Sequence, residues 1–95
     1  MSDSIHVTIL RCADGSYYVG LTEDLTSREN AHNNGRGPKY TFLRRPVKLV
    51  YSESYDSLEK ATGRERQLKR WSRTKKKALI VGDTTRLKQL SKRRS

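Results

Sequence analysis

The stretch VTILRCADGSYYVG, residues 7–20, decides the fold of this 95-residue chain. Residues 5–10 are rich in β-branched side chains, which favour a strand. Asp14 and Gly15 then form a turn signal, and residues 17–21 supply a second strand-like run. Together the two runs and the turn between them predict a β-hairpin.

The length of the hairpin loop decides which side chains share a face, because a slip of one residue reverses every side chain of a strand. A loop of three residues, 13–15, with Gly15 in a left-handed bulge, places Thr8 and Tyr18 on one face. A two-residue turn places them on opposite faces. We expect the three-residue form.

Outward from the hairpin, helix and strand signals alternate. Polar caps precede the helices and glycines follow them. The predicted order is ββαβααα, an α/β (α+β) fold with a three-stranded antiparallel sheet flanked by helices. We expect a single domain over residues 1–95, with basic C-terminal helices at about 73–92. The other signals are a helix capped by Asp24 and ended near Gly35, a strand over 47–51, and a long helix capped by Ser57 and reaching about 71.

The charge of the chain requires an anionic partner. Lys and Arg total 21 against 10 acidic residues, a net charge of +11. DNA is the first candidate, with RNA not excluded, because clustered cations gain free energy by releasing counterions from phosphates. No long apolar stretch or signal peptide favours a membrane, and no obligate protein partner is evident. With Cys12 as its only cysteine, the chain is expected to be cytoplasmic.

One acidic residue falls on the apolar face of the long helix. Leu58, Ala61 and Leu68 have the spacing of one helical face, and Glu65 lies on the same face. Glu is almost never fully buried without a partner. Either Glu65 sits at the edge of the face and pairs with a nearby cation, or it is an inward carboxylate held for a divalent metal ion. Mg²⁺ needs only one or two protein carboxylates.

The first helix carries a second pair of chemically active residues. Arg28 and His32 are four residues apart and therefore lie on one face. They are either solvated surface residues, or a guanidinium that binds phosphate and an imidazole that assists proton transfer.

These residues together resemble the signature of the GIY-YIG nuclease superfamily. Residues 18–20, Tyr-Val-Gly, are similar to the second half of the signature, and Thr8, Tyr18 and Arg28 follow one another at intervals of ten residues, as in the family. His32 and Glu65 occupy the positions of its helix-borne His or Tyr and its metal-binding Glu. The runs over 7–20, 46–51 and 69–73 resemble the small stand-alone bacterial, UPF0213-like branch.

The resemblance implies a metal-dependent DNA endonuclease that leaves a 5′ phosphate and a 3′ hydroxyl, with DNA repair as a candidate context. It implies Mg²⁺ or Mn²⁺ bound by Glu65. The implied catalytic residues are Tyr18, Arg28, His32, Glu65 and the residue at the first-tyrosine position, Thr8.

Two departures from the family pattern leave an alternative open. Thr8 replaces the first tyrosine, and it has no acidic phenol with which to activate water. The later asparagine of the repair and homing branches is also absent. The alternative is therefore a catalytically impaired nucleic-acid-binding module. If the chain is an enzyme, we expect Thr8 at the mouth of the site, too short to reach the water, beside a gap that holds solvent.

The nucleic-acid-binding surface is expected in the loop over 36–45 and the basic run over 69–77. Tyr40 either stacks on an exposed base, which would favour single-stranded or distorted DNA, or packs the loop. Trp71 continues the apolar face of the long helix and is expected in the core. The predicted contact residues are Arg36, Lys39, Tyr40, Thr41, Arg44, Arg45, Lys69, Arg73 and Lys75.

Overall fold

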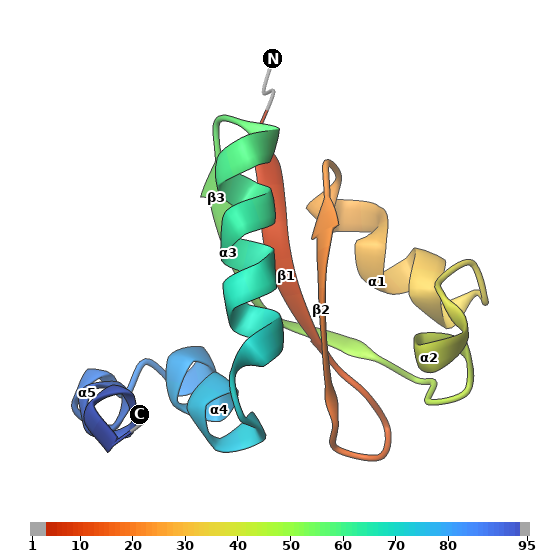
Figure 1. Ribbon diagram of the computed structural model, residues 1–95. Helices are drawn as coiled ribbons and strands as arrows, with labels where there is room; N and C mark the ends of the chain where they lie inside the picture. Colours follow the sequence, from red (N-terminus) through yellow and green to blue (C-terminus); the bar gives the residue numbers. More distant parts are fainter. Residues whose placement is uncertain (1–3, 94–95) are drawn as a thin grey trace.

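The computed structural model describes residues 4–93 and is built on a three-stranded antiparallel sheet (Figure 1). Strand β1 (Ile5–Arg11) lies in the centre, between β2 (Tyr17–Thr22) and β3 (Lys48–Tyr55). The predicted sheet is confirmed. The third strand runs four residues beyond its predicted end, because residues 52–55 pair with the start of β1 and alternate between exposed and half-buried positions.

The hairpin between β1 and β2 closes as the sequence predicts. The N–H of Cys12 donates to the carbonyl of Ser16 at 2.8 Å, and the N–H of Gly15 donates to the carbonyl of Cys12 at 2.9 Å. Gly15 has a φ of +85°, a left-handed conformation that favours glycine. The loop therefore has three residues, 13–15, in the bulged form.

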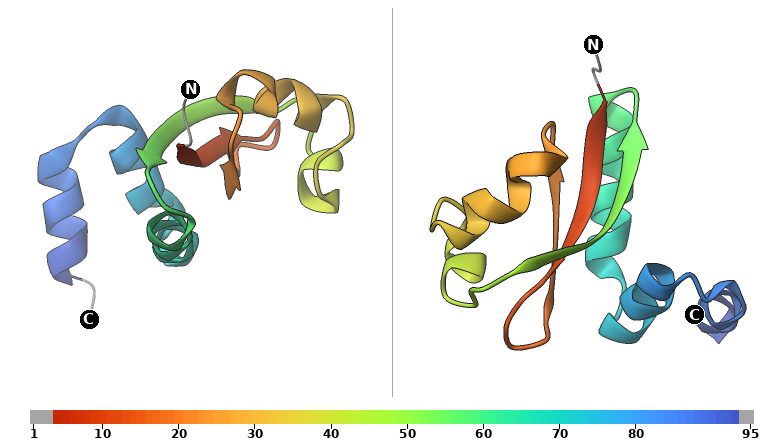
Figure 2. Two further views of the ribbon diagram at one scale, coloured as in Figure 1. Left: turned by 90° about the horizontal axis from the view of Figure 1, so that it is seen from above. Right: turned by 180° about the vertical axis from the view of Figure 1, so that it is seen from behind.

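Helices cover the two faces of the sheet. Figure 2 shows α3 (Leu58–Arg70) on one face and α1 (Leu25–Asn33) on the other. The main core lies under α3, and a smaller cluster of Leu10, Cys12 and Val47 lies on the α1 side. Burial raises the pKa of the Cys12 thiol, as expected for a structural cysteine. The main core consists of Val7, Ile9, Val19, Ala61 and Leu68.

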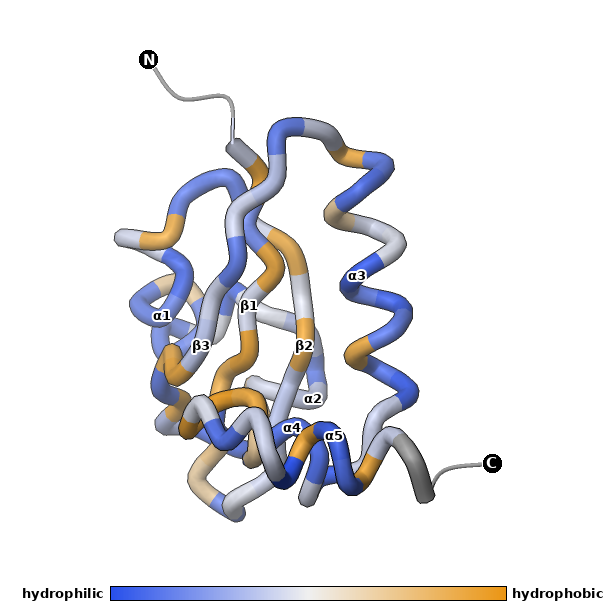
Figure 3. Tube along the Cα trace, turned by 90° about the vertical axis from the view of Figure 1, so that its left-hand side faces the viewer, coloured by the Kyte–Doolittle hydropathy of each residue, from blue (hydrophilic) through white to orange (hydrophobic). Residues whose placement is uncertain are grey.

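Side-chain caps begin the helices where the sequence predicts them. Asp24 accepts hydrogen bonds from the N–H groups of Thr26 and Ser27. Ser57 caps α3 and Ser72 caps α4 (Arg73–Val81) in the same way. In Figure 3 the hydrophobic positions gather along β1 and β2, whereas α3 is mostly hydrophilic. The short helix α2 (Lys39–Phe42) was not predicted, since four residues show no helical period.

Two basic helices follow α3. Helix α4 (Arg73–Val81) ends at Gly82, which has a φ of +74°, and α5 (Thr84–Arg93) packs on α4. Figures 1 and 2 place α5 and α1 at opposite ends of the molecule, with α3 between them. None of the helices described is long and apolar enough to cross a membrane.

Candidate active site

The register of the hairpin brings Thr8 and Tyr18 to one face. Thr8 pairs with Gly20 and Leu10 pairs with Tyr18, and paired residues of antiparallel strands point to the same side of a sheet. The predicted shared face is confirmed, but the expected mouth with a solvent-filled gap is wrong. Thr8 is 0% exposed, and its hydroxyl donates to the carbonyl of Gly20 at 3.3 Å.

The guanidinium of Arg28 lies directly over Gly20. A Cβ built at position 20 would come 3.2 Å from Cζ of Arg28 and would collide with Nη2. Nη1 donates to the carbonyl of Leu21 at 3.0 Å, which holds the side chain flat against β2. Nε of Arg28 is buried and has no hydrogen-bond partner within residues 4–93. A buried donor without a partner costs free energy unless a ligand satisfies it.

Arg28 also has no carboxylate partner at ion-pair distance among the described residues. Burial lowers the pKa of its guanidinium, while Tyr18 and then Glu65 act in the opposite direction. Tyr18 from β2 and Glu65 from α3 are therefore the ionisable groups that favour the charged form of Arg28. Three of the five predicted catalytic residues, Tyr18, Arg28 and Glu65, thus interact electrostatically beside β2.

His32 is held in one tautomer by the loop that follows α1. The hydroxyl of Thr41 donates to the carbonyl of Pro38 at 3.1 Å, and its oxygen lies 2.9 Å from Nδ1 of His32. Since the hydroxyl has one proton, Nδ1–H is the donor and Nε2 retains its lone pair. A side chain at position 37 would overlap Nδ1, so Gly37 is required for this close approach.

The environment of His32 favours its neutral form. It is 5% exposed, and burial, followed by the charge of Arg28, lowers the pKa of its imidazole. Its ring centroid lies 5.9 Å from that of Tyr18. An uncharged imidazole beside a phenol can accept a proton near neutral pH.

Tyr40 and Thr41 do not have the free positions expected of nucleic-acid contacts. The ring of Tyr40 stacks on Tyr18 at 5.7 Å, and the guanidinium of Arg44 lies 3.8 Å from its centroid. Both contacts favour the packing alternative over a platform for bases. Thr41 is 0% exposed and positions His32, so the prediction that it contacts nucleic acid is wrong.

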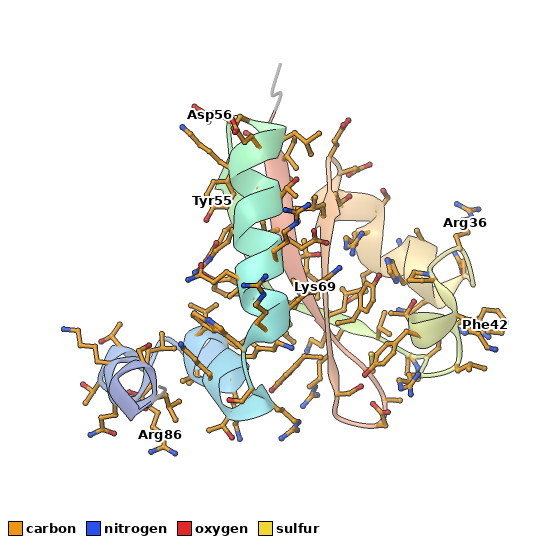
Figure 4. The ribbon with its side chains drawn as sticks, in the orientation of Figure 1. Arg36, Phe42, Tyr55, Asp56, Lys69 and Arg86 are labelled. Atoms are coloured by element: carbon orange, nitrogen blue, oxygen red, sulfur yellow. The ribbon has the colours of Figure 1, made fainter. Side chains whose placement is uncertain are left out.

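Glu65 is the carboxylate whose charge acts on Arg28. Its side chain is 17% exposed, and Oε2 lies 3.3 Å from Nζ of Lys69. Figure 4 shows Lys69 on the side of α3 that faces β2. Both interpretations of Glu65 are thus present in part, since its carboxylate pairs with Lys69 and its charge also acts on the guanidinium of Arg28.

Within the described residues, no three His, Cys, Asp or Glu side chains gather as a metal cage. A single hard carboxylate oxygen does fit a Mg²⁺ or Mn²⁺ ion whose other ligands are water and phosphate oxygens. Glu65 is the side chain that would hold such an ion.

Two polar residues that the sequence analysis gave no role fix α1 against the sheet. The amide of Asn33 donates to the carbonyl of Val47 at 2.9 Å and accepts from its N–H at 2.7 Å. One turn earlier, Glu29 accepts the N–H of Leu49 at 2.7 Å. These bonds fix α1 against the start of β3 and thereby help to set the position of Arg28, which directly precedes Glu29 in the helix. Glu29 and Asn33 are four residues apart and therefore lie on one face of α1, which is the sequence signal that indicates their shared role.

Glu53 and Arg64 fix α3 in a similar way. Arg64 binds both oxygens of Glu53, through Nε and Nη2, each at 2.9 Å. The hydroxyl of Tyr55 donates to Glu53 at 2.7 Å, and that of Tyr51 donates to it as well. Burial would raise the pKa of Glu53, but these donors lower it, and the pKa of Tyr51 rises to about 12. Glu65 follows Arg64 directly, so this clamp sets its direction.

Five of the seven predicted cationic contacts fall into two groups. Arg44 is bound to Asp14 at 3.0 Å, Arg45 donates to Phe42 and Asn33, and Arg73 donates to the carbonyl of Gly15. These three side chains have structural roles. By contrast, Arg36 and Lys39 are exposed and have no ion pair or hydrogen bond through their side chains in the part of the chain described. Figure 4 shows Arg36 projecting from the α1–α2 end of the molecule.

Comparison with known proteins identifies the family. Residues 5–78 match the GIY-YIG catalytic domain. The chain is 47% identical over 78 residues to the UPF0213 protein SSP2268 of Staphylococcus saprophyticus and equally identical to a UPF0213 protein of Staphylococcus aureus. Each match covers 82% of this chain and 95% of the relative.

Two solution NMR structures are similar in fold. The UPF0213 protein BH0048 of Bacillus halodurans is 41% identical, with a TM-score of 0.54 over 82% of this chain and 83% of that one. The protein EF2693 of E. faecalis is 31% identical, with a TM-score of 0.59 over 88% and 90%. The chain therefore belongs to the GIY-YIG family, a family of nuclease-type hydrolases. Within that family it is similar to the small UPF0213 proteins.

Proposed function

We propose that this protein is a metal-dependent endonuclease that hydrolyses phosphodiester bonds of DNA. The observation on which the proposal rests is Arg28, a partly buried cation with an unsatisfied Nε and no carboxylate partner within residues 4–93. Such a site is complementary to an anion that is present only when substrate binds. A phosphate fits it, because a guanidinium donates to two phosphate oxygens at once.

The chain supplies groups for each part of the reaction. Arg28 binds a non-bridging oxygen and stabilises the charge that builds on the phosphate in the transition state. Tyr18 orients the attacking water, and Nε2 of His32, left free by its bond to Thr41, accepts the proton. Glu65 would hold Mg²⁺ or Mn²⁺, which stabilises charge on phosphate and leaving oxygens as a Lewis acid.

A second candidate function follows from Thr8. It stands at the first-tyrosine position and is fully buried, with its hydroxyl bonded to Gly20. Neither its chemistry nor its placement replaces a phenol. This residue favours a module that binds nucleic acid and cleaves it slowly or not at all.

Incubation with supercoiled plasmid and with a single-stranded oligonucleotide, in Mg²⁺, Mn²⁺ or EDTA, separates the two functions. The endonuclease produces nicked and linear products only with metal, and Arg28→Ala removes them. Metal-independent retention of DNA without products would support the binding module. Absence of both cleavage and binding would contradict both proposals.

A further inference from the structure

A basic groove lies on the outer side of α3, away from the candidate active site. It has a volume of about 680 Å³ and is bounded by α3, the start of α4 and Leu90 of α5. Its charged lining consists of Arg66, Arg70 and Lys75, and no acidic residue of the described chain lines it. The groove is therefore a concave surface whose charged side chains are all positive.

Some cations of α3 have a carboxylate partner, whereas those that line the groove have none in the described chain. Lys60, Arg64 and Lys69 each have a carboxylate partner, at 3.3, 2.9 and 3.3 Å. Arg66 and Arg70 have neither an ion pair nor a side-chain hydrogen bond in the described chain. They are also four residues apart, a spacing at which like charges destabilise a helix. Within residues 4–93, no carboxylate at ion-pair distance offsets this repulsion.

The groove and the candidate active site lie on different sides of the same helix. Successive helical residues are separated by about 100°, so Arg66 lies adjacent to Glu65, while Lys69 faces the site and Arg70 faces the groove. A helix with its side chains is about 10–12 Å across. A strand with roughly 3.4 Å of rise per nucleotide crosses that width in about three to four nucleotides.

We propose that this groove binds the sugar–phosphate backbone of the DNA strand about three to four nucleotides from the scissile bond. The inference rests on the proposed nuclease function and assigns its flanking contacts to Arg66 and Arg70. Trp71 does not serve as a base platform, because Lys75 and Arg64 lie over its ring, at 4.3 and 5.2 Å. Recognition in the groove is therefore of phosphates, and it is tolerant of sequence.

The test compares Arg66→Ala/Arg70→Ala with Arg86→Ala/Lys88→Ala, which removes the same charge from exposed positions of α5 outside the groove. Binding of a fluorescent single strand of about twelve nucleotides is titrated in EDTA over a range of salt concentrations. Each phosphate contact to a single strand contributes roughly 0.7 to the slope of log binding constant against log salt concentration. The groove variant, which loses two contacts, should therefore lose about 1.4 units of this slope and about 25-fold in affinity at 0.1 M salt. The α5 variant should bind as the wild type does, and a dinucleotide should show no difference.

Equal losses of slope in the two variants, or no loss in either, would overturn the groove and leave the nuclease proposal standing. If the groove variant shows the expected loss of DNA affinity but the wild-type protein never cleaves DNA with metal, the groove is supported as a DNA site and the nuclease proposal is overturned. A wild type that fails to bind DNA at low salt would overturn both. Thermal unfolding of each variant shows whether it is folded.

Discussion

Gly20 lies beneath the guanidinium of Arg28, and the missing side chain makes room for it. The glycine therefore does not serve a turn, since its φ is not positive. It lets a cation from α1 lie flat on the edge strand β2, beside Tyr18. The Tyr-x-Gly pattern thus encodes both a phenol and the space for its cationic neighbour.

The substitution Gly20→Ala should displace Arg28 and slow cleavage by roughly 10²-fold, similar to the removal of one transition-state donor. Single-turnover kinetics measure the rate, and thermal unfolding measures the stability. Gly63→Ala is the matched addition of a methyl group, because nothing lies within 4 Å of that position. It should stabilise α3 by about 0.5–1 kcal/mol. Wild-type cleavage by Gly20→Ala would show that Arg28 need not occupy this place.

The pKa of His32 is lowered by burial and by Arg28, so folding disfavours the protonated imidazole. The resulting stability is present above the unfolded pKa of about 6.5 and is lost as the pH falls through the lower folded pKa. The free energy of unfolding, measured by urea titration, should decrease between about pH 6.5 and 5. His32→Gln should remove that decrease, while His6→Gln, on the exposed pair with Ser54, should retain it. A decrease that persists in His32→Gln would contradict the buried neutral imidazole.

Lys39 and Arg44 should respond differently to substitution by Ala. Lys39 is exposed without a side-chain partner in the described chain, so its loss should reduce the salt slope of DNA binding by roughly one unit and leave stability unchanged. Arg44 binds Asp14 and stacks on Tyr40, so its loss should also lower the melting temperature. Anisotropy titrations and thermal melts measure the two effects. An affinity independent of salt in the wild type would contradict an electrostatic interface.

Thr8→Tyr restores a phenol at the first-tyrosine position. Arg28 occupies the space over Gly20, so the new ring must extend over Ser52, the exposed β3 partner of Thr8. If the enzyme is slow because that phenol is missing, the rate should rise by about 10²–10⁴-fold. The melting temperature must be measured as well, since overpacking a buried position costs about 1–3 kcal/mol. An unchanged rate in a folded variant of an active enzyme would mean that Tyr18 and His32 suffice.

Local signals predicted most of the architecture. Asp24 and Ser57 cap helices at their expected places, and Gly15 closes the hairpin loop in the expected form. Each of these features depends on one or two neighbouring residues, which a sequence displays directly. The end of β3 was missed because its last residues become a strand only by pairing with the start of β1.

The sequence predicts the residues of the candidate site but not the residues that position them. Thr41 carries no sign in the sequence that its hydroxyl will bond His32 nine residues away, and it was assigned to the surface. The clamp between Glu53 and Arg64 joins a strand to a helix, and periodicity within either element does not reveal it. Long-range polar contacts of this kind depend on tertiary packing.

Metal-dependent cleavage by Glu65→Gln, measured beside DNA binding, tests the assignment of Glu65 as the metal ligand most directly. The matched control is Glu59→Gln, which removes the same charge from an exposed position of α3. Glu59→Gln should cleave at the wild-type rate with Mg²⁺ or Mn²⁺. Glu65→Gln should bind DNA as tightly as the wild type or more tightly, because Lys69 is released from its ion pair, yet give no metal-dependent product. Equal cleavage by Glu65→Gln and the wild type would contradict the assignment of Glu65 as the metal ligand.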